Sequence, residues 1–111
     1  MKTFEEFWPF YLGEHRHPVN RALHLVGTTL GLLIAIHAVW SRTWALLPAA
    51  LVSGYAFAWV GHFVIEKNRP ATFTHPLWSF LGDWKMWGLA VTGRLPAELE
   101  RLALRAEKAR A

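Results

Sequence analysis

Six histidines are the side chains with the widest chemical scope in this chain of 111 residues, which contains no cysteine. The lack of thiols excludes disulfides, thiol catalysis and cysteine-ligated zinc or iron–sulfur sites. Any metal ion must therefore be held by nitrogen and oxygen ligands. Three of the histidines, His24, His37 and His62, lie within long stretches that contain no charged residue. An ionisable side chain in such a stretch is a candidate for a functional site.

The spacing of small residues predicts that His24 and His62 come close together. If the two uncharged stretches form a helical hairpin, both histidines lie about equally far from its turn, because a helix rises by ~1.5 Å per residue. Each histidine also shares a helix face with small residues: Gly27, Thr28, Gly31 and Ala35 with His24, and Ala50, Gly54 and Ala58 with His62. Small residues at this spacing let membrane helices approach closely. Docking of these faces would place His24 and His62 within reach of one ion.

Further ligands lie near these two histidines in the sequence. Glu66 follows His62 by one helical turn, Asn20 precedes His24 by one turn, and His15 lies in the loop just outside. Two imidazoles and a carboxylate form the ligand set of oxygen-activating non-haem Fe(II) sites. A third imidazole in place of the carboxylate suits zinc as well. Both ligand sets remain open, as does the alternative that each histidine merely bonds to the backbone at an interface.

The other titratable side chains have simpler interpretations. His17 and His75 are expected in loops or on the surface, and His37, near the opposite end, is expected to be structural. Asp83 is the only aspartate, and the sequence favours either a solvated face or a partnership with Lys85.

The elements that must position these residues are predicted to be all-α and membrane-embedded. Residues 22–40 and 44–65 contain no Asp, Glu, Lys or Arg, and ~20 apolar residues suffice to cross ~30 Å of hydrocarbon. A buried hairpin in a soluble protein is the alternative, but two uncharged runs of this length favour a transmembrane hairpin. Basic residues flank its open end, whereas the connecting turn carries only Arg42. Because basic residues stay on the cytoplasmic side of a membrane, both termini are expected in the cytoplasm. If the protein is bacterial, the membrane is expected to be the inner membrane.

The segments outside the hairpin are predicted to be helical and amphipathic. Thr3 and Glu6 form a capping box for a short aromatic helix that is interrupted by Pro9 and lies at the membrane surface. Residues 77–91 are apolar but contain two charges, which indicates an interfacial or half-inserted helix. Residues 96–110 change from acidic to basic, which suits a solvated amphipathic helix. The whole chain, residues 1–111, is expected to be one membrane domain. Its net charge of +4 is placed as in a membrane protein, so no nucleic acid is expected as a partner.

Two motifs in the chain resemble those of a membrane family formerly catalogued as a domain of unknown function. The first motif consists of Phe10-Tyr11, His15, Pro18-x-Asn20 and His24. The second consists of Ala58-Trp59-Val60-Gly61-His62-Phe63 and Glu66-Lys67-x-Arg69-Pro70-Ala71. The family includes the fungal endoplasmic-reticulum dioxygenase that acts on 2-hydroxy fatty acids, and the resemblance covers roughly residues 4–93.

The resemblance implies an Fe(II)-dependent membrane dioxygenase that shortens 2-hydroxy fatty acids by one carbon, a step of fatty acid α-oxidation. Carried over to this sequence, the metal ligands would be His15, His24 and His62. Glu66 and Asn20 would be the further catalytic residues. Arg21 or Arg69 could pair with the carboxylate of the substrate, and O₂ would be the second substrate.

Two other functions remain open on the sequence alone. One is a non-catalytic membrane protein that binds lipid or uses the hairpin to pair with other helices. The other is a zinc-dependent membrane hydrolase in which Glu66 acts as general base. Because two helices enclose little volume, a homo-oligomer that completes the pocket is also expected.

Overall fold

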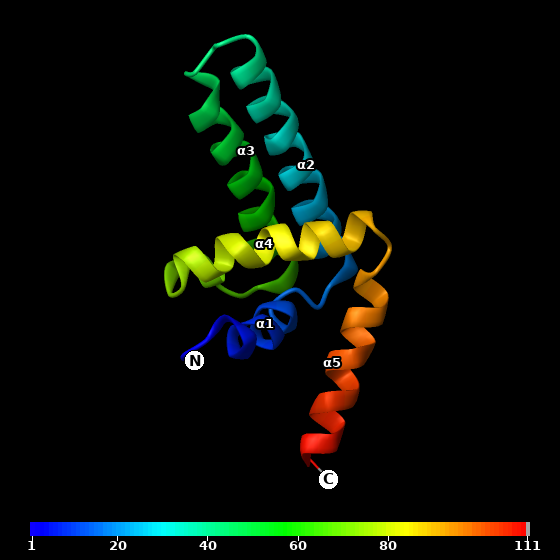
Figure 1. Ribbon diagram of the computed structural model, residues 1–111. Helices are drawn as coiled ribbons and strands as arrows, with labels where there is room; N and C mark the ends of the chain where they lie inside the picture. Colours follow the sequence, from blue (N-terminus) through cyan, green and yellow to red (C-terminus); the bar gives the residue numbers. More distant parts are fainter. Residues whose placement is uncertain (111) are drawn as a thin grey trace.

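The computed structural model describes residues 1–110, which contain helices and no strand (Figure 1). The five α-helices are α1 (Phe4–Gly13), α2 (Pro18–Trp40), α3 (Leu46–Val60), α4 (Pro76–Val91) and α5 (Leu95–Arg110). A π-helix, Gly61–Glu66, continues α3, and a short 3₁₀-helix covers Ala71–Phe73. The all-α prediction is confirmed. The single-domain prediction for residues 1–111 stays a prediction, and residue 111 lies outside the described part.

The two predicted spanning segments form an antiparallel hairpin (Figure 1). Pro18–Trp40 and Leu46–Glu66 are each long and apolar enough to cross a membrane, with mean hydropathies of 1.8 and 1.4. Only 17% of each of these apolar windows is buried inside the protein, whereas the core helix of a soluble protein would be mostly buried. Large apolar side chains such as Leu33 and Val52 are exposed along the hairpin. An exposed apolar surface of this extent marks contact with a membrane or with other proteins.

The small residues form the seam of the hairpin, as their spacing predicts. A Cβ atom at Gly27 would lie 2.7 Å from the Cβ of Phe57, and one at Gly31 would lie 2.9 Å from the backbone oxygen of Ala50. Neither position can therefore hold a larger residue unless the helices separate. This close approach determines how near the side chains at the base of the two helices come to each other.

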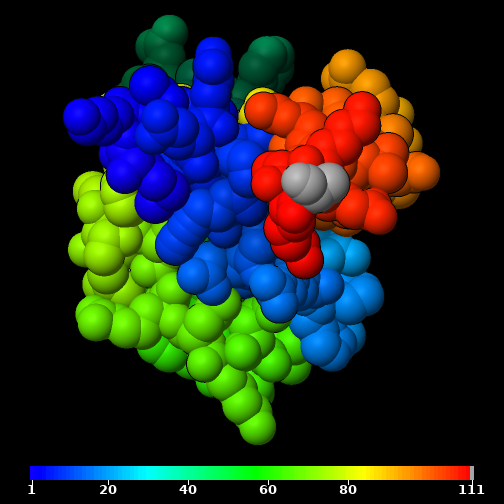
Figure 2. Space-filling model, turned by 90° about the horizontal axis from the view of Figure 1, so that it is seen from below, coloured from blue at the N-terminus to red at the C-terminus, as the bar shows by residue number. Residues whose placement is uncertain are grey.

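The remaining helices close the base of the hairpin, opposite its turn. In Figure 1, α4 lies across the base, α1 lies below α4, and α5 points away from the hairpin. Figure 2 views this end of the molecule, which α1 (blue), the segment after α3 (green) and α5 (red) cover. Both ends of the described chain lie here (Figure 1). α4 is tied to the hairpin by the indole N–H of Trp87, which donates to Thr29 Oγ1 at 2.9 Å.

The aromatic face of α1 is buried in protein, not spread on a membrane surface. Phe7, Trp8 and Tyr11 are at most 3% exposed, and they pack with residues of α4 and α5 such as Met86 and Leu95. These rings therefore pack against protein, whereas the position of the helix at a membrane surface stays a prediction. Aromatic residues serve both uses, and only the packing of α4 and α5 decides that these rings are buried.

Two further details of the sequence interpretation are corrected. α1 continues through Pro9 instead of being interrupted there. The proline has no N–H to donate to the carbonyl of Glu5, but Glu5 is exposed, so water can donate that hydrogen bond. Asp83 neither lies on a solvated face nor pairs with Lys85. Its carboxylate accepts a hydrogen bond from the Tyr11 hydroxyl, and the Lys85 ammonium lies 4.5 Å from the Trp8 ring centroid.

Candidate metal centre

Three buried histidines from three different elements converge at the base of the hairpin. His15 comes from the loop before α2, His24 from the first turns of α2, and His62 from the π-helix. Their exposed fractions are 1%, 4% and 2%. The Nε2 atom of His15 lies 3.0 Å from that of His24 and 3.0 Å from that of His62. Because these atoms all lie within 4.8 Å of one another, the cluster could hold one metal ion.

The other nitrogen of each imidazole is occupied. Each Nδ1 faces a carbonyl oxygen: that of Tyr11 for His15 (2.6 Å), that of Asn20 for His24 (3.1 Å), and the side-chain oxygen of Asn68 for His62 (2.8 Å). A carbonyl oxygen only accepts, so each Nδ1 carries the hydrogen. In the neutral ring each Nε2 then presents a lone pair. Such second partners orient the ligands of metal sites.

Three lone pairs that point at one another in a buried space suit a cation between them. Burial, followed by the nearby imidazoles of His24 and His62, lowers the pKa of His15 well below its usual range, so the neutral ring is favoured. Nitrogen ligands bonded to an ion at ~2.1 Å with angles of ~90–110° lie ~2.9–3.4 Å apart. The two separations of 3.0 Å agree with this range, and all three ligand atoms lie within 4.8 Å of one another. The donor set therefore fits a metal ion with three imidazole ligands.

His62 lies on the π-helix, and Glu66 ends it. The four-residue step from His62 to Glu66 leaves the two on roughly the same side of either an α-helix or a π-helix. The Glu66 carboxylate bonds to His17 and Asn20 beside the histidine cluster. Lys67 then takes a left-handed conformation (φ 59°), and the backbone N–H of Asn68 donates to the His62 carbonyl at 3.0 Å. This sharp return of the chain brings the Asn68 side chain to the His62 imidazole. π-helical turns of this kind are frequent at functional sites.

Glu66 and Asn20 form a layer beside the cluster. Glu66 Oε2 accepts from the backbone N–H of His17 at 2.8 Å and from Asn20 Nδ2 at 3.0 Å. The carboxylate therefore satisfies a donor at the start of α2, where the helix dipole favours negative charge. Asn20 is fully buried, and its Oδ1 has no hydrogen-bond partner among the described residues. That oxygen packs against Gly61, where any Cβ would overlap it.

The two arginines expected to bind substrate have other partners in the structure. Arg21 Nη1 donates to the backbone carbonyls of His15 (2.9 Å) and Arg16 (2.8 Å), and so stabilises the loop that carries His15. The guanidinium of Arg69 lies 5.1 Å from the centroid of the Phe73 ring. Their roles toward a substrate, and the catalytic roles of Glu66 and Asn20, remain predictions.

The other three histidines lie outside the cluster. His17 is exposed and caps α2, since its Nδ1 accepts from the Val19 backbone N–H at 3.1 Å. His75 stacks on Trp78 with a centroid separation of 5.5 Å, and His37 is exposed near the hairpin turn.

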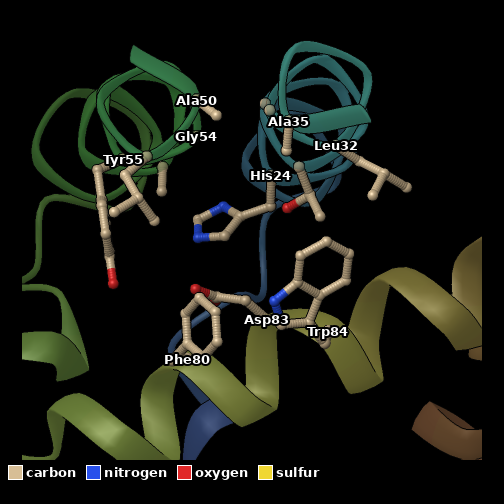
Figure 3. A pocket seen from close by; sticks show the side chains of 14 residues that line it. His24, Leu32, Ala35, Ala50, Gly54, Tyr55, Phe80, Asp83 and Trp84 are labelled. Carbon is tan, nitrogen blue, oxygen red and sulfur yellow. The ribbon is translucent and has the colours of Figure 1, made fainter. Parts of the chain in front are cut away.

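An apolar cavity of about 140 Å³ leads from His24 along the hairpin seam. Figure 3 shows His24 between the two hairpin helices and α4, which contributes Phe80, Asp83 and Trp84 to the opposite wall. The lining residues of α2 extend from His24 to Ala35, a length of ~16 Å along the helix axis. The cavity therefore joins the histidine cluster to the part of the hairpin whose outer surface is apolar.

Residues 1–95 match the protein family described as 2-hydroxy-palmitic acid dioxygenase Mpo1-like. The chain belongs to this Mpo1-like family. No curated protein and no solved structure was found to match it. The match includes all three clustered histidines and the helices that carry them, and it ends where α5 begins. The family suggested by the two sequence motifs is therefore confirmed.

Two residues that contact the cluster of this Mpo1-like chain, Asn68 and Tyr11, and a third that lines a cavity with His24, Asp83, were not predicted as site residues. Asn68 falls at the unspecified position of the second motif, so the motif drew no attention to it. The Tyr11 ring stacks on His15 with a centroid separation of 4.2 Å, and its hydroxyl bonds to Asp83. The signal for Asp83 was present in the sequence, since it is an acidic residue in an otherwise apolar stretch.

Proposed function

We propose that this protein is an Fe(II)-dependent membrane dioxygenase that shortens 2-hydroxy fatty acids by one carbon. The observation that carries the proposal is the convergence of three imidazole lone pairs beside an apolar cavity that His24 lines. The family supports the same reaction class, since its description is that of a 2-hydroxy-palmitic acid dioxygenase.

The cavity suits a lipid acid whose head group lies at the cluster. Its walls along α2 and α3 are small and apolar, so an acyl chain can lie against Gly31 and Gly54 without displacing polar groups. The hairpin exposes large apolar side chains to lipid, so such an acid can enter from the bilayer. Arg21 lies near the cluster through its bond to the His15 carbonyl, and its remaining N–H groups are the candidates to pair with the substrate carboxylate.

His15, His24 and His62 would hold the metal ion, which would supply coordination sites for the oxygen atoms of the acid and for O₂. The balance needs no further reductant: one 2-hydroxy acid and one O₂ give the shortened acid, CO₂ and water, and the acid supplies all four electrons. The protein holds each imidazole through its Nδ1–H, which fixes the nitrogen that faces the ion. Burial of the cluster excludes bulk water from the reacting groups. Glu66 and Asn20 hold the start of α2, and hence His24, in place.

The location that follows is an integral membrane protein, with the metal centre near the end of the hairpin where both termini lie. Basic residues concentrate at that end, so we place it and both termini in the cytoplasm.

The test is oxygen consumption by the purified protein in lipid nanodiscs after anaerobic loading with Fe(II). We expect uptake with 2-hydroxypalmitic acid, one shortened acid per O₂, and no uptake with palmitic acid. His62→Ala should abolish this uptake, whereas His37→Ala, which changes an exposed histidine far from the cluster, should not. If protein that retains iron consumes O₂ with none of the 2-hydroxy acids tested, the proposed reaction is refuted.

A zinc-dependent hydrolase is the second candidate, because a set of three imidazoles also suits zinc. Native protein that contains zinc and turns over substrate without O₂ would favour it. Protein that binds lipid normally but takes up neither iron nor zinc would instead favour the non-catalytic membrane protein.

A further inference from the structure

Asp83 lies where two cavities meet beside the histidine cluster. The seam cavity lies on one side, and a second cavity of about 150 Å³, bounded by α2 and α4, includes Arg21 and Trp87. His24 and Asp83 line both cavities. Among their lining residues Asp83 is the only acidic side chain, and Figure 3 shows its carboxyl group directed from α4 towards the His24 ring.

One carboxyl oxygen of Asp83 is used and the other is free. Oδ1 accepts from the Tyr11 hydroxyl. The second oxygen has no hydrogen-bond partner among residues 1–110 and, unlike the sealed Oδ1 of Asn20, is open to the cavities. Its free lone pairs can therefore accept a hydrogen bond from a bound molecule.

The charge of Asp83 is not explained by an ion pair. The nearby ammonium of Lys85 lies over the rings of Trp8 and Phe4, and the salt bridge of this region joins Arg101 to Glu98. Burial raises the pKa of the Asp83 carboxyl to about 7, which shows how unfavourable its charge is at this position. A hydrogen bond to Tyr11 alone would be served as well by a neutral amide. A carboxyl group at this wall therefore points to a role toward a ligand.

We propose that Asp83 determines specificity for the 2-hydroxyl group of the lipid acid by accepting its hydrogen bond. The inference rests on the proposed function and names the residue that reads the substrate. With the acyl chain in the seam, the free oxygen of Asp83 faces the head group beside His24. The lone pairs of this oxygen attract the hydrogen of the 2-hydroxyl group and repel the carboxylate of the same acid. The hydroxyl and carboxylate groups therefore take different positions relative to Asp83. Because chain, carboxylate and hydroxyl are then all directed, one enantiomer of the 2-hydroxy acid is preferred.

Equilibrium binding tests this inference separately from turnover. Titrations of the full chain in nanodiscs use tryptophan fluorescence, since Trp84 lines the seam cavity, and are made anaerobically both with iron and after its removal. The probes are 2-hydroxypalmitic acid and 2-fluoropalmitic acid, which has a similar size but no hydrogen to donate. A hydrogen bond from the hydroxyl group to the free oxygen of Asp83 predicts a preference for the hydroxy acid of up to about tenfold. Equal binding of the two acids by the wild-type protein would overturn the inference without any variant.

Two variants separate ligand recognition from a structural role of Asp83. Asp83→Asn should reduce the preference to less than about threefold, whereas Tyr11→Phe, which keeps the ring and removes only the bond to Asp83, should retain it. Glu100→Gln, on an exposed part of α5, is the matched control for loss of a carboxylate. Loss of the preference in Tyr11→Phe to the same extent, or its retention in Asp83→Asn, would overturn the inference. A preference that depends on Asp83 in protein that consumes no O₂ would uphold the inference and refute the proposed reaction.

Discussion

Replacement of Gly61 by alanine is predicted to disrupt the layer that supports the metal centre. A Cβ at Gly61 would overlap Oδ1 of Asn20 and lie 2.8 Å from its Cγ. Asn20 is fully buried and Gly61 lies on the π-helix that carries His62, so neither backbone can move without shifting a ligand. The Asn20 side chain must therefore leave its position, and its 3.0 Å hydrogen bond to Glu66 is lost.

The magnitude follows from two costs and one gain. Loss of the hydrogen bond in a buried place costs about 1–3 kcal/mol, and overpacking costs about 1–3 kcal/mol more. Alanine in a helix recovers about 0.5–1 kcal/mol relative to glycine. We therefore expect Gly61→Ala to lower the free energy of unfolding by about 1–5 kcal/mol, with a parallel loss of bound metal because His24 and His62 shift.

The assay is unfolding in mild detergent by titration with a denaturing detergent, followed by circular dichroism, with metal content as a second readout. Gly88→Ala is the matched control, because nothing lies within 4 Å of a Cβ at that helical glycine; it should be neutral or slightly stabilising. Asn20→Ala removes the overlapping atoms, so Gly61→Ala should cost much less in that background. If Gly61→Ala is as stable as Gly88→Ala and keeps its metal, the described packing of Asn20 against Gly61 is wrong.

Two further predictions concern the partners of His62 and the docking of α5. Asn68→Ala removes the acceptor of the His62 Nδ1–H and should weaken metal binding about 10–100-fold without unfolding the hairpin. A chelator-competition titration measures the metal affinity. Unchanged affinity would show that Asn68 does not orient His62. Glu98 accepts hydrogen bonds from Arg101 and from the Trp8 indole, and these lower its pKa from 4.5 to about 2. Because its pKa is lower in the folded state, its stabilising contribution is complete above pH 4.5 and is lost as the pH falls towards 2. The melting temperature of the wild-type protein should thus fall more steeply across this range than that of Glu98→Gln, while parallel profiles would show that Glu98 does not hold α5.

The hairpin and two of its histidines could be predicted because they depend on local pattern. Length and lack of charge indicate the spanning helices, and the spacing of small residues indicates which faces meet. Since a regular helix has a fixed rise per residue, the number of residues between each histidine and the turn shows that His24 and His62 lie at the same depth in the hairpin. His15 lies in a loop, where no periodicity applies, so its nearness in the sequence and the family motif pointed to it, but its position could not be counted from a helix.

The contacts that the sequence interpretation did not predict depend on tertiary structure or on an irregular backbone. Glu66 lies beside the cluster, but its bonds to His17 and Asn20 depend on the tertiary contact between the start of α2 and the π-helix. The rings of Phe7 and Trp8 suit lipid and protein equally well, so their burial follows only from the packing of α4 and α5. Asn68 reaches His62 through a left-handed residue that no pattern of polarity indicates.

The most direct test of the central claim is the metal content of the full chain purified without oxygen and reconstituted with Fe(II). The structure predicts about one tightly bound ion per chain, lost in His15→Ala, His24→Ala and His62→Ala but kept in His37→Ala. A wild-type protein that binds no ion, or a His62→Ala variant that binds it as tightly as the wild type, would contradict the three-histidine metal centre.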